Sequence, residues 1–166
     1  YPKSMKPLQC RCWQIWMMVD SNGDVGRHSS LAFDSAGNMA VAYHDTTAGT
    51  LKFARWNGVA WEIEVVDSEA WVGWYVSLTF DSLDRPGISY FDVDSQDLKY
   101  AYWDGTAWQT QPVDTAGDVG RWTSLVLDTA GRPHIGYYDV TSADCNYAYW
   151  DGSAWHALGT ISPNWY

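Results

Sequence analysis

The stretch YAYWDG occurs at residues 100–105 and again at residues 147–152, and a related stretch, FARWNG, occupies residues 53–58. Each stretch contributes one tryptophan to a series with a spacing of 47 residues, Trp56, Trp103 and Trp150. The same register holds without insertion or deletion over residues 19–155. A constant period of this length is typical of proteins in which every copy of the repeat folds into one structural unit.

Each copy contains the pattern of four short β-strands separated by turns. In the first copy the predicted strands are residues 30–33, 39–44, 51–56 and 61–66. Before the fourth strand every copy places an Asx-Gly pair, which supplies the positive φ of a tight hairpin: Asn57-Gly58, Asp104-Gly105 and Asp151-Gly152. Two tryptophans flank each of these turns, and we expect them to meet across the hairpin.

The second strand of each copy, such as GISYFD at residues 87–92, has little polar alternation, which predicts burial on both faces. Four-stranded antiparallel units that repeat every 47 residues and pack face to face predict an all-β fold, a β-propeller with three blades per chain. The predicted divisions are an N-terminal arm, residues 1–18, and blades at residues 19–65, 66–112 and 113–166, the last with a C-terminal tail.

Three blades are fewer than the roughly four to eight of typical propellers, so we expect oligomerisation to complete the ring. The arm carries a spare strand, WQIWMMV at residues 13–19, which resembles the fourth strand of the first copy. We expect it to dock on the third blade of a neighbouring chain, whose own fourth strand, WHALGTI, is weak. A homodimer would form a six-bladed ring, and head-to-tail strand donation would build a higher oligomer or a filament. The remaining alternative is a piece of a longer propeller with an unstructured tail.

The composition limits the partners of the chain. Its 166 residues include 12 Trp and 11 Tyr, and 20 acidic against 10 basic residues give a net charge of −10. This charge argues against nucleic acid as a partner, and the lack of an apolar run of roughly 18 residues argues against a membrane. The chain begins at Tyr1 without a leader pattern, and we expect an extracellular or cell-surface location.

Three cysteines occur in the sequence. Cys10 and Cys12 are too close together for a relaxed mutual disulfide. Cys145 aligns with Leu51 and Leu98 of the other copies, so we expect it to be a small residue of the core.

The WDG-x-x-W pattern at residues 103–108 and 150–155 resembles the hairpins of tachylectin-like and fucose-binding propeller lectins. The stretch SLVLDTAGRPHIGYYDV at residues 124–140 is similar to the repeats of bacterial sialidase-like propellers. This resemblance covers residues 19–155 and implies a propeller fold with a carbohydrate ligand. The chain lacks the Arg of strand two and the Glu before WDG that the resemblance to fucose-binding blades implies, and its Asp, Gly and Trp are not spaced as in a sialidase Asp-box. Neither fucose specificity nor sialidase chemistry therefore carries over.

In a four-stranded blade, the loop that joins two blades and the loop between strands two and three emerge at the same end. This end gathers the candidate ligand-binding residues, which are Arg27, His28, Trp74, Tyr75, Arg121, Trp122, Asp45, Asp92 and Asp139. Aromatic rings stack on the apolar face of a sugar while charged groups bind its hydroxyls, so the predicted function is multivalent, lectin-like carbohydrate binding. The alternative is that the aromatic residues pack between blades and each Arg pairs with an Asp of the next blade. The opposite end, with the DSAGN and WNG turns, is expected to be purely structural.

Two other classes of function remain as alternatives. The first is a structural module whose role is self-assembly. The second is a sialidase-like glycosidase, which we do not expect, because most aspartates recur at turns whereas a glycosidase needs two carboxylates in different environments. No catalytic residue or cofactor is predicted. No metal is predicted either, since the calcium-like spacing of Asp20, Asn22 and Asp24 is not kept in the other copies.

Overall fold

The computed structural model describes residues 17–159, which form twelve β-strands in three four-stranded antiparallel sheets. Sheet 1 contains β1 (Val25–Phe33), β2 (Met39–Asp45), β3 (Thr50–Trp56) and β4 (Trp61–Asp67). Sheet 2 contains β5 (Val72–Phe80), β6 (Pro86–Asp92), β7 (Asp97–Trp103) and β8 (Trp108–Asp114). Sheet 3 contains β9 (Val119–Leu127), β10 (Pro133–Asp139), β11 (Asp144–Trp150) and β12 (Trp155–Leu158).

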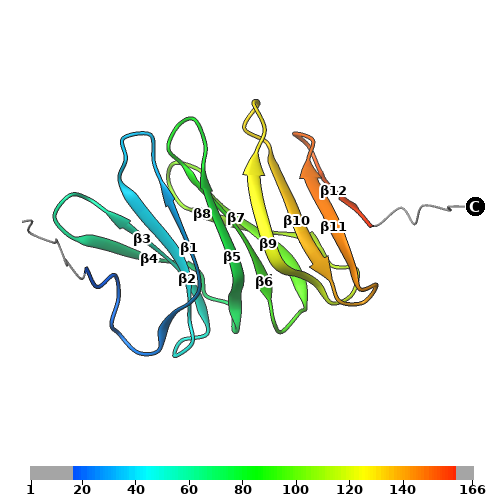
Figure 1. The fold of residues 1–166 in the computed structure, drawn as a ribbon, viewed down its shortest axis with the longest axis horizontal. Helices are drawn as coiled ribbons and strands as arrows, with labels where there is room; N and C mark the ends of the chain where they lie inside the picture. Colours follow the sequence, from blue (N-terminus) through cyan, green and yellow to red (C-terminus); the bar gives the residue numbers. More distant parts are fainter. Residues whose placement is uncertain (1–16, 160–166) are drawn as a thin grey trace, which may run out of the picture.

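The three sheets stand in a row, and their first strands, β1, β5 and β9, run side by side through the middle of the molecule (Figure 1). Within each sheet the strands are hydrogen-bonded in sequence order, from the first strand to the fourth. This arrangement is propeller-like, and the prediction of an all-β chain built from repeated four-stranded antiparallel units is confirmed. Residues 17–159 contain no helix that could cross a membrane.

Most strand positions agree with the prediction to within one residue, but the first strand of each sheet does not. β1 begins at Val25, five residues before the predicted start at Ser30, and includes Gly26 and His28 at positive φ. Its pairing with β2 shifts register between Val25 and Ser30, the mark of a β-bulge. The segment DSNGDVGRHS was expected to be a loop because a glycine and a bulge interrupt the alternation that identifies a strand.

The hairpins between the third and fourth strands confirm the predicted turns. Gly58, Gly105 and Gly152 have φ angles of 95°, 106° and 108°, a region that favours glycine. The flanking tryptophans meet edge to face across each hairpin, with ring centroids 5.6 to 5.9 Å apart, in the pairs Trp56–Trp61, Trp103–Trp108 and Trp150–Trp155. These tryptophans are only half-buried, so they cover the hairpin ends and leave part of each ring at the surface.

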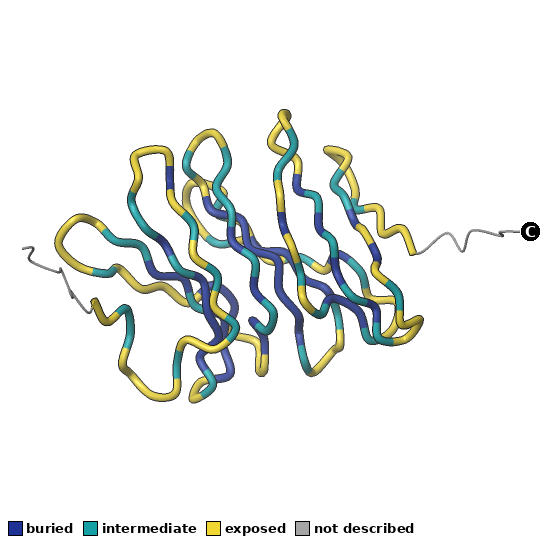
Figure 2. The backbone as a smooth tube through the Cα atoms, viewed as in Figure 1, coloured by how far each residue is buried: buried dark blue, intermediate teal, exposed yellow. Residues whose placement is uncertain are grey.

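The apolar core lies between neighbouring sheets (Figure 2). One cluster joins sheets 1 and 2 around Leu51 and Ile88, and another joins sheets 2 and 3 around Leu98 and Ile135. β6 has a neighbouring sheet on both sides and is buried at all seven residues, as its sequence predicted. β10 alternates between buried and half-buried residues because, in the part of the chain that the structure describes, no sheet covers the far side of sheet 3.

Consecutive sheets are also joined by a buried ionic network. Asp67, the last residue of β4, accepts hydrogen bonds from the hydroxyl of Tyr90 at 2.6 Å and from Nζ of Lys99 at 2.9 Å, both in sheet 2. Burial alone raises the pKa of Asp67, but these two donors and the N–H of Glu69 together outweigh it and hold the pKa below its usual value. We call Asp67, Tyr90 and Lys99 the latch of sheet 2.

The other two sheets have latches at equivalent positions. In sheet 1, Asp20 accepts hydrogen bonds from Tyr43 at 2.8 Å and from Lys52 at 3.1 Å. In sheet 3, Asp114 accepts a hydrogen bond from Tyr137 at 2.5 Å, while Asn146 stands at the position of the lysine. Each sheet is therefore held by a carboxylate that precedes its own first strand.

The predicted N-terminal strand, residues 13–19, lies mostly outside the described residues. Residues 17–19 are not in a strand. The predicted boundaries at 65/66 and 112/113 fall inside β4 and β8, which run on to Asp67 and Asp114. At the other end β12 has only four residues, in line with the weak strand expected from its sequence.

Cys145 does not lie in the core, and this prediction is wrong. Leu51 and Leu98, its equivalents in the other sheets, are fully buried because the next sheet covers them. Cys145 is exposed, since no further sheet follows sheet 3 among residues 17–159.

Candidate functional site

The loops of the predicted site emerge at one end of each sheet, as expected. In sheet 1, the N–H of Thr46 donates to the carbonyl of Asp24 at 2.8 Å, and the N–H of Asp24 donates to the hydroxyl of Thr47 at the same distance. Asp118 and Thr141 repeat the second of these bonds at 2.9 Å in sheet 3. The loop before the first strand and the loop after the second strand are thus joined to each other.

The structure brings together the four predicted aromatic residues of the first strands. His28 stacks on Trp74 with ring centroids 4.7 Å apart and meets Tyr75 edge-on at 4.9 Å. Tyr75 in turn lies 5.0 Å from Trp122, whose side chain is 61 % exposed. We call these four residues the aromatic row, because they form a continuous line across β1, β5 and β9.

The backbone of the aromatic row is strained at the same position in every sheet. His28, Tyr75 and Trp122 have φ angles of 52°, 53° and 50°, in the left-handed region that residues with large side chains rarely occupy. All three lie where the pairing of the first strand with the second shifts register. Strain of this kind persists only where surrounding contacts hold it, and here the rings at these positions contact one another across neighbouring sheets.

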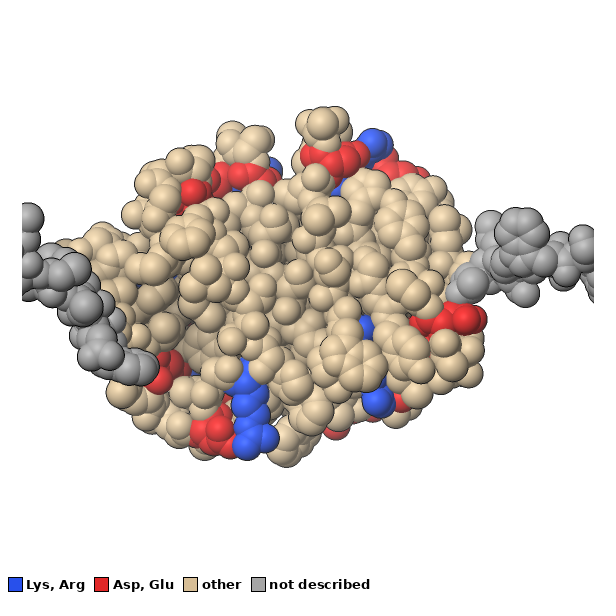
Figure 3. Space-filling model, viewed as in Figure 1, with Lys and Arg blue, Asp and Glu red and all other residues tan. Residues whose placement is uncertain are grey.

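The two predicted arginines pair with aspartates of their own linker and not with the next sheet. Arg27 contacts Asp24 at 2.9 Å, and Arg121 contacts Asp118 at 2.7 Å. In sheet 2 both positions change together, to Trp74 and Trp71. Figure 3 shows one face of the molecule, on which charged groups gather toward the upper and lower rims and uncharged side chains cover the middle.

The predicted aspartates Asp45, Asp92 and Asp139 lie inside the sheets and not on the surface. Each is at most 8 % exposed. Asp45 contacts Lys52 at 2.7 Å, Asp92 lies 3.7 Å from Lys99, and Asp139 accepts hydrogen bonds from Ser142 and Asn146. These carboxylates bind groups of the latches and loops. The aromatic row therefore lies beside the two paired arginines, and the three aspartates that the sequence predicted for the same site are not part of it.

A buried histidine lies behind the aromatic row. His44 is fully buried, and its Nδ1 is 2.7 Å from the carbonyl of Val72, so this nitrogen carries the proton. Among the described residues, its Nε2 has no hydrogen-bond partner. Burial lowers the pKa of His44, and burial together with the nearby His44 and Arg27 lowers the pKa of His28.

The structure also contains two grooves at the opposite end of the sheets. Groove A lies between sheets 2 and 3 and has a volume of about 360 Å³. Its lining includes four aromatic side chains, those of Tyr100, Tyr102, Trp103 and Trp150. Tyr100 lies close to Gly87: a Cβ at position 87 would lie 2.5 Å from the Tyr100 hydroxyl, so a larger residue there would displace the ring.

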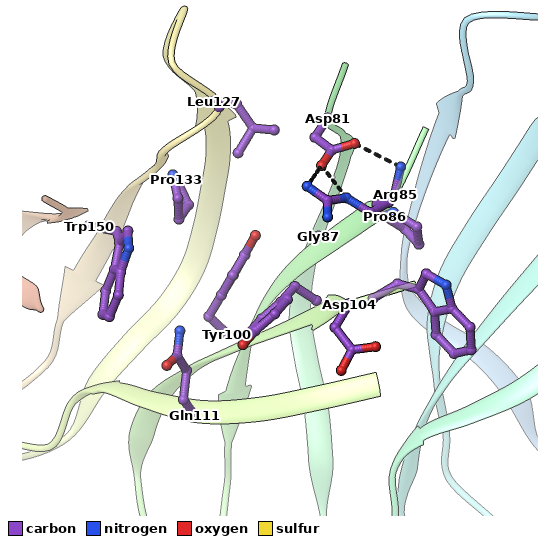
Figure 4. Close-up of a pocket in the computed structure, with 13 residues that line it drawn as sticks. Asp81, Arg85, Pro86, Gly87, Tyr100, Asp104, Gln111, Leu127, Pro133 and Trp150 are labelled. Atoms are coloured by element: carbon purple, nitrogen blue, oxygen red, sulfur yellow. Dashed lines mark hydrogen bonds and ion pairs between the residues drawn. The ribbon is translucent and has the colours of Figure 1, made fainter. Parts of the chain in front are cut away.

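Polar groups complete groove A. Trp150 stands on one side and the Asp81–Arg85 pair on the other, with Tyr100 and Gln111 between them (Figure 4). Arg85 donates to Asp81 at 2.7 Å. Asp104 at the rim accepts hydrogen bonds from the N–H of Ala107 and the hydroxyl of Thr106, which lower its pKa to about 2.

Groove B lies between sheets 1 and 2 and has a volume of about 500 Å³. It shares Trp103 and Arg85 with groove A but carries Arg55 and Glu64 at the positions that Tyr102 and Gln111 hold in groove A. Glu64 accepts a hydrogen bond from the indole N–H of Trp108 at 2.8 Å. The two grooves are therefore related by the repeat and differ in charge.

We expected the end of the sheets that carries the DSAGN and WNG turns to be purely structural, and the two grooves lie at this end. The first strands of neighbouring sheets are in close contact, and apart from Leu127 at the end of β9 the residues that line the grooves lie on the later strands and on the turns. The sequence holds one signal for groove A, which is that YAYW supplies three aromatic residues in four positions at residues 100–103.

Comparison with models of known protein families and with curated proteins finds no match for this chain.

Proposed function

We propose that the protein is a non-enzymatic carbohydrate-binding protein of propeller-like architecture, and that groove A is its principal binding site. The observation that carries the proposal is the lining of groove A, in which Tyr102, Trp103 and Trp150 stand beside the Asp81–Arg85 pair. Groove B, with its additional charges, is a second site of the same kind.

The chemistry of a sugar fits this lining. A pyranose has an apolar C–H face that stacks on an aromatic ring, and hydroxyls around its edge that need directed donors and acceptors. Arg85 donates, Asp81 and Asp104 accept, and the Gln111 amide does both. A volume of about 360 Å³ is at the lower end of the range for ligand pockets, which suits one or two sugar units.

The same residues favour binding over hydrolysis. A glycosidase needs one carboxyl group that stays protonated near neutral pH, beside another that is ionised. In groove A, burial tends to raise the pKa of Asp81, but its hydrogen bonds from Arg85 and Leu83 bring the pKa below its usual value. Asp104 has a pKa of about 2. Both groups are anions at neutral pH, so neither can act as the acid.

The aromatic row is the other candidate location for the same function, because Trp122 and Tyr75 offer a stacking surface with Arg121 nearby. Its rings already stack on one another, and its arginines are paired with aspartates. Groove A is favoured because its aromatic side chains line a concave site together with the Asp81–Arg85 pair and Gln111.

A glycan array on the full chain tests the function, and variants test the site. Tyr102→Ala with Gln111→Ala removes one ring and one amide from groove A, and we expect at least about a tenfold loss of affinity by calorimetry. Trp122→Ala with Tyr75→Ala removes two of the four rings of the aromatic row and serves as the control. If no glycan binds the wild-type chain, the proposed function is wrong; if only the row variant loses binding, the proposed site is wrong.

A further inference from the structure

We infer that the open side of sheet 1 and the open side of sheet 3 are two halves of one interface, and that its occupant is a second copy of this chain. Two copies joined in this way form a closed ring of six sheets with two identical junctions. The inference rests on the interfaces within the chain and is independent of carbohydrate binding. Sheet 1 meets sheet 2, and sheet 2 meets sheet 3, through the same set of contacts. The outer side of sheet 1 and the outer side of sheet 3 each carry one half of this set without its partner, and we call them the unused halves.

The first unused half is apolar and lies on β1. Leu78 and Leu125, at equivalent positions of β5 and β9, are 7 % and 5 % exposed because the preceding sheet covers them. Leu31, their equivalent on β1, is 57 % exposed. Phe33, two residues further along the same strand, is also exposed. Sheet 1 therefore presents a surface shaped to receive a preceding sheet.

The second unused half lies on β11. Phe53 and Tyr100, at equivalent positions of β3 and β7, are 5 % and 7 % exposed because each packs on a tryptophan of the next sheet. The ring centroids are 5.3 Å apart for Phe53 and Trp108, and 5.4 Å apart for Tyr100 and Trp155. Tyr147, the third member of the series, is 40 % exposed. The tryptophan that completes the series is Trp61 of another copy.

A close glycine contact repeats in the same way. A Cβ on Gly73 would lie 3.0 Å from the Cβ of Leu51, and a Cβ on Gly120 would lie 2.7 Å from the Cα of Leu98. Gly26, their equivalent, has nothing within 4 Å of such a Cβ. The equivalent of Leu51 and Leu98 is the exposed Cys145. Gly26 of one copy and Cys145 of another are thus a matched pair.

Hydrogen bonds between the first strands follow the same series. The N–H of Leu78 donates to the hydroxyl of Ser30, and the N–H of Leu125 donates to the hydroxyl of Ser77, both at 3.0 Å. The next bond in the series joins the N–H of Leu31 to the hydroxyl of Ser124 in another copy. Leu31 belongs to sheet 1 and Ser124 to sheet 3, and sheet 2 lies between these two sheets (Figure 1), so the two residues are not paired within one described chain.

A second copy is the occupant that meets all these requirements at once. The apolar, aromatic, glycine and hydrogen-bonding positions all repeat every 47 residues. If sheet 3 of one copy packs on sheet 1 of another as sheet 1 packs on sheet 2, each of these positions therefore meets its partner. Six sheets fall within the roughly four to eight of closed propellers. The junction joins two different surfaces, and a two-fold axis closes the pair without leaving an open side.

Sedimentation velocity on the full chain from about 1 to 100 μM tests the inference. We expect a species with twice the 18.7-kDa mass of the chain. Leu31→Arg places a charge in the junction and should weaken dimerisation at least about 100-fold. Val59→Arg, at an exposed valine in the turn after β3, is the matched control and should leave the mass unchanged.

Cys145→Leu gives a second test that a folding defect cannot imitate. It restores the residue that stands against glycine in the two internal interfaces, and we expect dimerisation to tighten about tenfold. A monomeric wild-type chain at the highest concentration overturns the inference, as does an unchanged dimer in Leu31→Arg or weaker association in Cys145→Leu. A series of ever larger species overturns the closed ring.

Discussion

Asp67 is the last residue of β4 in sheet 1, and its carboxylate accepts a 2.6-Å hydrogen bond from the hydroxyl of Tyr90 in sheet 2. This contact fastens one repeat to the next from within the core, because both residues are buried. Replacing Tyr90 by Phe removes the donor while keeping the ring. We expect the free energy of unfolding to fall by about 1.5 to 3 kcal/mol, the range for hydrogen bonds to charged groups, measured by urea denaturation.

Tyr102→Phe is the matched control for this change, since the Tyr102 ring is partly exposed and its hydroxyl takes no part in a latch. We expect it to alter stability by less than about 0.5 kcal/mol. Equal losses in the two variants would show that the Tyr90 hydroxyl has no special role.

The latch lysine of sheet 2 should be the more costly residue to remove. Lys99→Met keeps the length of the side chain but leaves Asp67 and Asp92 without their buried cation. We expect a loss of about 3 to 5 kcal/mol, as for other broken buried ion pairs. Sheet 3 provides the reference, because Asn146→Met removes no cation and should cost less. Chemical denaturation that ranks the two variants in the opposite order would contradict this account.

Acid should weaken the protein through the same latch. The pKa of Asp67 is below its unfolded value, so the stability that it contributes is complete above the unfolded pKa of about 4 and is lost as pH falls through the folded pKa. Asp67→Asn should flatten the dependence of unfolding free energy on pH below about 4. Urea titrations at a series of pH values compare the slope of unfolding free energy against pH in the wild type with the slope in Asp67→Asn.

His44 predicts a second loss of stability at milder acidity. Its pKa is lowered by burial, and although the hydrogen bond to the Val72 carbonyl and the charges of Asp45 and Asp24 oppose the shift, the unfolded chain binds the proton more readily. Stability is therefore complete above about pH 6.5 and falls toward the folded pKa, by up to about 1.4 kcal/mol per pH unit. His44→Phe adopts the residue found at Phe91 and should remove this dependence from thermal melts between pH 8 and 5. A melting profile that keeps its slope in the variant would assign the effect to another group, such as His28.

Groove A depends on a close approach at Gly87. Gly87→Ala places a Cβ 2.5 Å from the Tyr100 hydroxyl, so the buried ring must shift, and we expect a loss of about 1 to 3 kcal/mol. Gly136→Ala is the control, because that glycine also lies in a second strand and has nothing within 4 Å of an added Cβ. Differential scanning calorimetry should separate the two variants; similar melting temperatures would mean that the ring moves without cost.

The features that could be predicted from the sequence are those that lie within one repeat. The 47-residue period, the Asx-Gly turns and the alternation of apolar residues placed β2, β3 and β4 to within one residue. The start of β1 escaped prediction because a bulge at His28 and a glycine at position 26 hide the strand pattern. Turns and the alternation of apolar residues can be read from the local sequence. The positive φ at His28 cannot, because it occurs where the strand contacts a neighbouring sheet.

The candidate site was harder to predict because it depends on contacts between repeats. His28, Trp74, Tyr75 and Trp122 were placed together correctly. Asp45 and its equivalents were expected near the ligand, but buried cations and loop hydrogen bonds hold them inside the sheets. Grooves A and B arise from how neighbouring sheets are spaced, and no single repeat encodes that spacing.

The order of the latch residues along the chain bears on how the protein is made. Each latch carboxylate precedes its tyrosine by 23 residues, in sheet 1 (Asp20 and Tyr43) as in sheet 2 (Asp67 and Tyr90). A ribosome releases the chain from its N-terminus, so every sheet can be fastened by a residue that has already emerged. Synthesis can thus complete the sheets one after another, and no finished sheet waits with an unpaired buried tyrosine for sequence still to be translated.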